Sequence, residues 1–103
     1  MSAAGGDTEG EVVVALTGVL TLGTLPAART RLLAALGGDR PVAVDCAGAT
    51  ECDVAFVQLL ESARLLATRL GTTQRLAGPP PAALAAVLAE GGFRGWAPAG
   101  SAA

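Results

Sequence analysis

The chain has 103 residues, of which 51% are hydrophobic and 16% charged, and its formal net charge is −2. This length suits one domain, and the apolar content excludes the class of disordered proteins. The seven basic residues are arginines spread along the chain, so they form no cluster that could neutralise phosphates, and we expect no nucleic-acid partner. No apolar run reaches the roughly 20 residues that span a bilayer, and no secretion signal is visible. We therefore expect a cytoplasmic protein without direct membrane insertion.

The first part of the chain predicts a strand followed by a helix. Residues 1–10 are small and polar, and we expect a flexible N-terminus. The β-branched run 11–16 predicts a strand, and residues 19–22 are expected to continue it past a bulge at the intervening glycine. Thr24 is a suitable N-cap, and the apolar residues that follow recur at helical spacing as far as Leu36.

The middle of the chain repeats this order. Residues 41–45 are apolar and bounded by turn residues, which predicts a buried strand, and residues 47–50 are predicted to form a loop. Asp53 then precedes a long apolar periodicity that ends at Gly71, so a second helix is expected between these two residues.

The last part predicts a short strand over residues 73–77, a break at 78–81, and a final helix that ends at Gly91. Phe93 is expected to fold back onto the domain, and residues 94–103 to form a flexible tail. Strands that alternate with helices indicate a mainly parallel sheet covered by helices. The sequence therefore predicts one α/β domain over residues 11–93.

The residue types needed for catalysis are missing. The chain has no His, Tyr or Lys, no serine in a nucleophile elbow, and no phosphate-binding Gly-x-x-x-x-Gly-Lys loop. Cys46 and Cys52 match no common metal spacing and are expected to be reduced thiols, with a redox-sensing pair as the alternative. We therefore expect no enzyme activity, no cofactor and no metal.

Several segments together resemble the STAS family of bacterial regulatory domains. They are Gly18–Thr21, Thr24–Leu36, the strand Val42–Asp45, Asp53, Gln58–Leu60 and the Leu76–Pro79 turn, and the likeness spans roughly residues 11–93. The resemblance implies an α/β fold with a central four-stranded, mainly parallel mixed sheet and about three to four helices packed on it.

One position departs from this family. In anti-sigma-factor antagonists, the segment similar to residues 53–56 reads Asp-Ser-Ser-Gly or Asp-Ser-Ala-Gly, and a partner kinase phosphorylates the first serine. Here the segment is Asp53-Val54-Ala55-Phe56. Because valine has no hydroxyl group, no phosphorylation is expected at Val54.

The resemblance still implies a partner-binding surface where the second helix begins. The residues expected to form it are Thr50, Glu51, Cys52, Asp53, Val54, Ala55 and Gln58. The alternative is that Asp53 is a helix cap and Phe56 a core residue and nothing more. Thr50 is the nearest hydroxyl that could replace the missing serine. Asp45 is expected to hold the preceding loop through backbone hydrogen bonds.

We therefore expect a non-enzymatic regulatory module that binds another protein. The first candidate partner is an anti-sigma factor or a related ATPase-fold kinase. The alternatives are that the chain is an accessory STAS subunit of a lipid-transport (Mla-type) ABC complex, where it would bind the ATPase subunit, or a component of a bacterial chemotaxis or signalling system.

Overall fold

A computed structural model describes residues 10–91 of the chain. Strands and helices alternate along this part, as predicted. The elements are β1 (Val12–Ala15), β2 (Gly18–Leu20), the 3-10 turn η2 (Leu22–Thr24), α1 (Leu25–Leu36), β3 (Val42–Asp45), β4 (Ala49–Cys52), α2 (Val54–Arg69), β5 (Gln74–Leu76) and α3 (Ala82–Glu90). The expected fold-back of Phe93 and the expected flexible ends at 1–9 and 94–103 lie outside the described residues.

The strands form two small parallel sheets. One sheet has the order β1-β3-β5, and the other pairs β2 with β4. The first pairing aligns Val12 with Val42, and β5 joins the other side of β3 with Gln74 opposite Val42. Each strand pair is joined through a helix, which is the connection that parallel strands require.

The predicted four-stranded mixed sheet is wrong in two respects. Within residues 10–91 there are five strands in two sheets, and all of their pairings are parallel. The difference arises in the segment 47–50, which was predicted as a loop although Ala49–Cys52 forms strand β4. The sequence Ala-Thr-Glu-Cys contains one β-branched residue and no large apolar one, so it carries little strand signal, and pairing with β2 supplies its order.

Two glycines let the chain pass from the first sheet to the second. Gly18 has a φ of +77°, a conformation that favours glycine, and the register between β2 and β4 shifts directly after it. Its N–H donates to the carbonyl of Gly48 at 3.0 Å. Gly48 also lies close to Thr17, because a Cβ atom there would meet the Thr17 Cγ2 at 2.9 Å. The predicted bulge at Gly18 is therefore confirmed.

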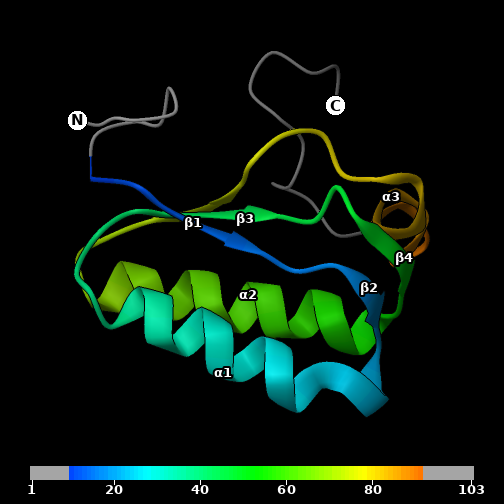
Figure 1. Cartoon of the computed structure of the whole chain (residues 1–103), viewed down its shortest axis with the longest axis horizontal. Helices are drawn as coiled ribbons and strands as arrows, with labels where there is room; N and C mark the ends of the chain where they lie inside the picture. Colours follow the sequence, from blue (N-terminus) through cyan, green and yellow to red (C-terminus); the bar gives the residue numbers. More distant parts are fainter. Residues whose placement is uncertain (1–9, 92–103) are drawn as a thin grey trace.

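The helices α1 and α2 lie side by side against one face of the sheet formed by β1 and β3, and α3 packs beside β4 (Figure 1). Each helix buries an apolar stripe at the predicted spacing. The buried helix residues are Ala28, Leu32 and Leu36 of α1, Phe56, Val57, Leu60, Ala63 and Ala67 of α2, and Leu84 and Leu88 of α3. They meet the strand residues Val14, Leu20, Val42 and Val44, and Leu16 between β1 and β2, in one core.

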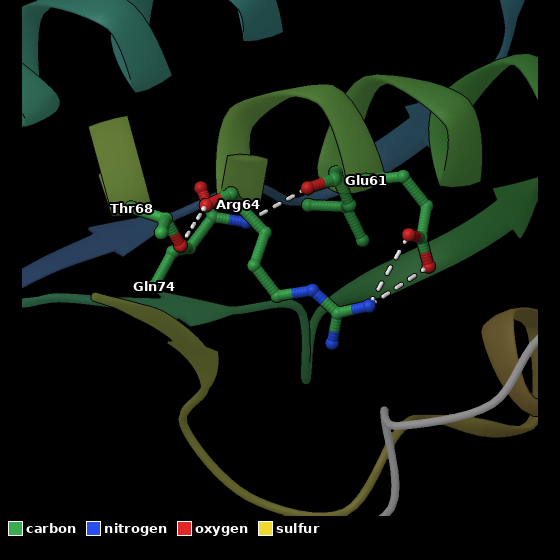
Figure 2. A network of polar contacts seen from close by, with 5 residues as sticks. Glu61, Arg64, Thr68 and Gln74 are labelled. Carbon is green, nitrogen blue, oxygen red and sulfur yellow. Dashed lines mark hydrogen bonds and ion pairs between the residues drawn. The ribbon is translucent and has the colours of Figure 1, made fainter. Parts of the chain in front are cut away.

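One polar contact of α2 connects it to β5, and another lies within the helix. Figure 2 shows Glu61, Arg64 and Thr68 of the helix together with Gln74, the first residue of β5. The buried Gln74 donates from Nε2 to the carbonyl of Leu60 at 3.1 Å. On the partly exposed side of the helix, an Arg64 guanidinium nitrogen lies 3.2 Å from the Glu61 carboxylate. The first contact ties the helix to the sheet, whereas a partly exposed ion pair stabilises little.

Replacing Phe56 by alanine should remove the largest fully buried side chain of the core. We expect Phe56→Ala to lower the free energy of unfolding by about 3 to 5 kcal/mol, because the lost ring leaves a cavity. The free energy of unfolding is measured by urea unfolding followed by circular dichroism. Leu65→Ala is the control, since the Leu65 side chain is 63% exposed and its loss should change stability by less than about 0.5 kcal/mol. Similar losses for the two variants would contradict the assignment of Phe56 to the core.

Candidate functional site

The predicted partner-binding residues lie together where β4 ends and α2 begins, and we call this set the β4–α2 surface. Its members are Thr50, Glu51, Cys52, Asp53, Val54, Ala55 and Gln58. Thr50, Glu51, Val54 and Gln58 are exposed, whereas the other three are half-buried. Four of the seven predicted residues are therefore accessible to a partner, while whether a partner binds there stays a prediction.

Asp53 is the N-cap of α2, as predicted, and its carboxylate also makes a second contact. The Oδ1 atom accepts a hydrogen bond from the Phe56 N–H at 3.0 Å, which satisfies an otherwise unpaired donor of the first turn. The Oδ2 atom accepts one from the Leu22 N–H at 2.9 Å, on the turn that precedes α1. The carboxylate therefore joins two segments that lie 31 residues apart in the sequence.

The turn that carries Leu22 is closed by further hydrogen bonds. The Thr21 N–H donates to the Thr24 Oγ1 at 3.0 Å, and the Thr24 hydroxyl donates to the Val19 carbonyl at 2.8 Å. The Thr24 N–H also donates to the Thr21 carbonyl at 2.8 Å. Thr24 does occupy the N-cap position of α1, but its hydroxyl makes no cap bond to that helix and instead closes the preceding turn.

Two exposed apolar residues, Leu22 and Val19, lie on the segment that contacts the β4–α2 surface, in addition to Val54, which belongs to it. The sequence singled out only Val54. Leu22 is 70% exposed, Val54 47% and Val19 45%. Leu22 was predicted to continue a strand over residues 19–22, but the strand ends at Leu20 because η2 begins at Leu22. Val19 lies opposite Glu51 in the β2–β4 register. A signal was present in the Thr-Leu-Gly-Thr sequence of residues 21–24, since threonine and glycine are common in turns.

The other side chains near this surface serve the fold. Phe56 is fully buried, so the hypothesis that it is a core residue is confirmed. Asp45 accepts a hydrogen bond from the Ala47 N–H at 2.9 Å, so it holds the loop after β3 as predicted. Phe56 is therefore not placed to contact a partner directly, whereas the half-buried Asp45 borders an open hollow.

The two cysteines have raised thiol pKa values. Burial raises the pKa of Cys46 to about 12, and the nearby Cys52 and Asp45 add to this shift. Burial, with a smaller contribution from Asp53, also raises the pKa of the half-buried Cys52. Redox sensing needs an accessible thiol with a lowered pKa, so neither thiol has the property that the redox-sensing alternative requires.

Two small open hollows can be located on the described surface. One, of about 180 Å³, lies at the carboxyl ends of β3 and β5 and is bordered by Asp45, Cys46 and the prolines 79–81. The other, of about 170 Å³, lies between β2 and α1. Within residues 10–91 no cluster of three or more His, Cys, Asp or Glu side chains could hold a metal ion. None of the helices in this range is both long and apolar enough to cross a membrane.

Comparison with protein families identifies the family of the chain. A family model described as "Mlab, STAS domain" matches residues 5–95. This range covers most of the chain and includes both sheets, all three helices and the β4–α2 surface. The comparisons with curated proteins and with solved structures return no match.

Thiol labelling should distinguish the two cysteines. At pH 8, below the Cys46 pKa of about 12, the folded chain keeps this thiol protonated and shielded, so we expect iodoacetamide to modify Cys46 far more slowly than in urea-unfolded chain. Because the raised pKa stabilises the neutral thiol of the folded state, this protection holds at neutral pH and weakens as pH rises toward 12. Mass spectrometry of the digested protein gives the extent of modification at Cys46 and at Cys52 separately. Rapid modification of Cys46 in folded protein would contradict its burial.

Proposed function

Since this chain belongs to the STAS domain family, we propose that it is a non-enzymatic interaction module whose partner protein binds the β4–α2 surface. One observation carries the proposal. At the position where the resembling antagonists carry the phosphorylated serine, Val54 is 47% exposed on the first residue of α2. An apolar side chain held in water on an ordered helix end can gain free energy by burial against another protein.

The described side chains support a binding role more than a catalytic one. The two hollows contain no pair of groups placed as nucleophile and base. In the hollow after β3, the Asp45 carboxylate holds a backbone N–H at 2.9 Å. The thiol of Cys46, which borders the same hollow, has a pKa raised to about 12. A protonated thiol is a poor nucleophile.

The first candidate partner is an anti-sigma factor or a related ATPase-fold kinase, because the chain resembles STAS proteins that antagonise such kinases. Val54 gives that kinase no hydroxyl to phosphorylate at this position, so the proposed interaction is not released by phosphorylation at Val54. In this proposal the complex is controlled by the amounts of the two proteins and not by a chemical switch.

The second candidate is an accessory role in a lipid-transport ABC complex, with its ATPase subunit as the partner. The observation that favours it is the description of the matched family model as Mlab, a name shared with Mla-type transport. The two candidates use the same surface and differ in which purified protein binds it.

Val54→Arg tests the proposed surface. A cation placed at the centre of an apolar contact must be desolvated without a partner, so we expect the dissociation constant to rise at least about tenfold. The dissociation constant is measured by titration with the purified kinase and with the purified transporter ATPase from the same organism. Val13→Arg is the matched control, since Val13 is 46% exposed but lies on β1 in the other sheet. Unchanged binding by Val54→Arg would refute the surface, and failure of both proteins to bind the natural chain would refute the proposed function.

Incubation with the candidate kinase and ATP tests whether the chain lacks a phosphorylation switch. We expect no phosphate on residues 50–56 of the natural chain, because Val54 has no hydroxyl group and Thr50, which has one, precedes the serine position by four residues. Val54→Ser restores a hydroxyl at an exposed position and should become a substrate of a kinase that recognises this surface. Phosphopeptide mass spectrometry gives the readout. Phosphate on Thr50 of the natural chain would overturn the claim that the module is not switched.

A further inference from the structure

We propose that Leu22 and Val54 form one apolar anchor for the partner, and that Asp53 is the positioning residue that holds them side by side. The inference rests on the proposed function, because it names which side chains of that surface carry the binding. It adds Leu22, from the β2–α1 connection, to a site otherwise built from β4 and α2. Figure 1 shows β2 and the start of α2 next to each other at one end of the molecule.

The geometry of the Asp53 carboxylate carries the first step. Its two oxygens each accept one backbone N–H, that of Phe56 in α2 and that of Leu22 in η2. Val54 is the residue directly after Asp53, and Leu22 is the residue whose N–H this carboxylate holds. One side chain therefore fixes the separation between the backbones that carry the two exposed apolar groups.

The rigidity of the turn carries the second step. Leu22 has the most exposed side chain among the large apolar residues of the described chain, yet its backbone is held by Asp53 and its turn is closed by Thr21 and Thr24. Such exposure costs free energy, whereas an ordered backbone loses little further entropy when a partner binds. An exposed leucine on a fixed turn is therefore suited to insert into a pocket of another protein.

The charges around the anchor indicate the kind of partner. Glu51 and Asp53 are the charged members of the β4–α2 surface, and both are acidic. Glu51 is exposed, and its register partner Val19 borders the hollow between β2 and α1, where the charged lining residue is Arg31. A second copy of this chain would bring acidic groups toward acidic groups, which is unfavourable. The occupant that fits is a different protein with an apolar pocket bordered by Arg or Lys.

Asp53→Asn separates the two contacts of the carboxylate. An amide has one acceptor oxygen, and its nitrogen is a donor that cannot accept from a backbone N–H. Asparagine is also a good N-cap, so it should keep the bond to Phe56 and lose the bond to Leu22. We expect hydrogen exchange of the Leu22 amide to become faster, while the Phe56 amide stays protected.

A double-mutant cycle with Leu22 tests whether Asp53 acts through that residue. Against whichever of the purified kinase and transporter ATPase binds the natural chain, we expect Leu22→Ala to raise the dissociation constant about tenfold and Asp53→Asn about three- to tenfold. In the Leu22→Ala background, Asp53→Asn should add less than about twofold, because the leucine that it positions is gone. A purely electrostatic role of Asp53 would keep its full effect in that background, and that result would overturn the positioning role.

Leu65→Ala is the matched control, because Leu65 is an exposed leucine 11 residues further along α2 than Val54. It should change the dissociation constant by less than about twofold. If Leu22→Ala has as little effect while Val54→Arg abolishes binding, the anchor is wrong and the proposed function stands. If neither variant changes binding, the anchor and the β4–α2 surface are both wrong, and if neither protein binds the natural chain, the proposed function itself fails. A natural chain that dimerises, and loses its dimer in Leu22→Ala, would show that the occupant is a second copy and overturn the proposed partner chemistry.

Discussion

The two hydrogen bonds of the Asp53 carboxylate connect the parts of the molecule on which the candidate site depends. One oxygen caps α2 at Phe56, and the other holds the N–H of Leu22 before α1. A carboxylate has acceptors on both oxygens and no donor, so it can satisfy two backbone N–H groups that approach from different segments. The backbone at the start of α2 and the backbone of the turn before α1 are therefore held next to each other.

This arrangement exists because β2 and β4 lie side by side beyond the first sheet. Gly18 takes a positive φ where β1 gives way to β2, and Gly48, between β3 and β4, leaves room for Thr17. The two neighbouring segments can therefore change direction together. The pairing then places the chain after β2 next to the chain after β4. Phe56 packs in the core, and Cys52 of the β4–α2 surface packs against that core, whereas Val54 stays exposed. Phe56 thus serves stability and Val54 the proposed recognition, while Asp53, as the cap of the same helix turn, contributes to both.

The replacement of a serine by valine changes the physical basis of the proposed interaction. A phosphorylated serine would place about two negative charges at the helix N-terminus and alter binding through electrostatics. Val54 contributes exposed apolar area instead, directly after the acidic Asp53. Association driven by apolar burial depends weakly on salt, whereas the acidic residues favour a basic neighbour on the partner and influence the rate of encounter.

The sequence by itself determined the elements whose signals are local. The spacing of apolar residues located α1, α2 and α3, the β-branched runs located β1 and β3, and residue chemistry identified the cap at Asp53 and the loop-holding role of Asp45. Only the tertiary structure decided the rest. Strand β4 has little propensity of its own and is ordered by β2, and the exposure of Leu22 together with its bond to Asp53 depends on two segments 31 residues apart. Periodicity reports which face of one element is buried, but it does not report which distant element completes a hydrogen bond.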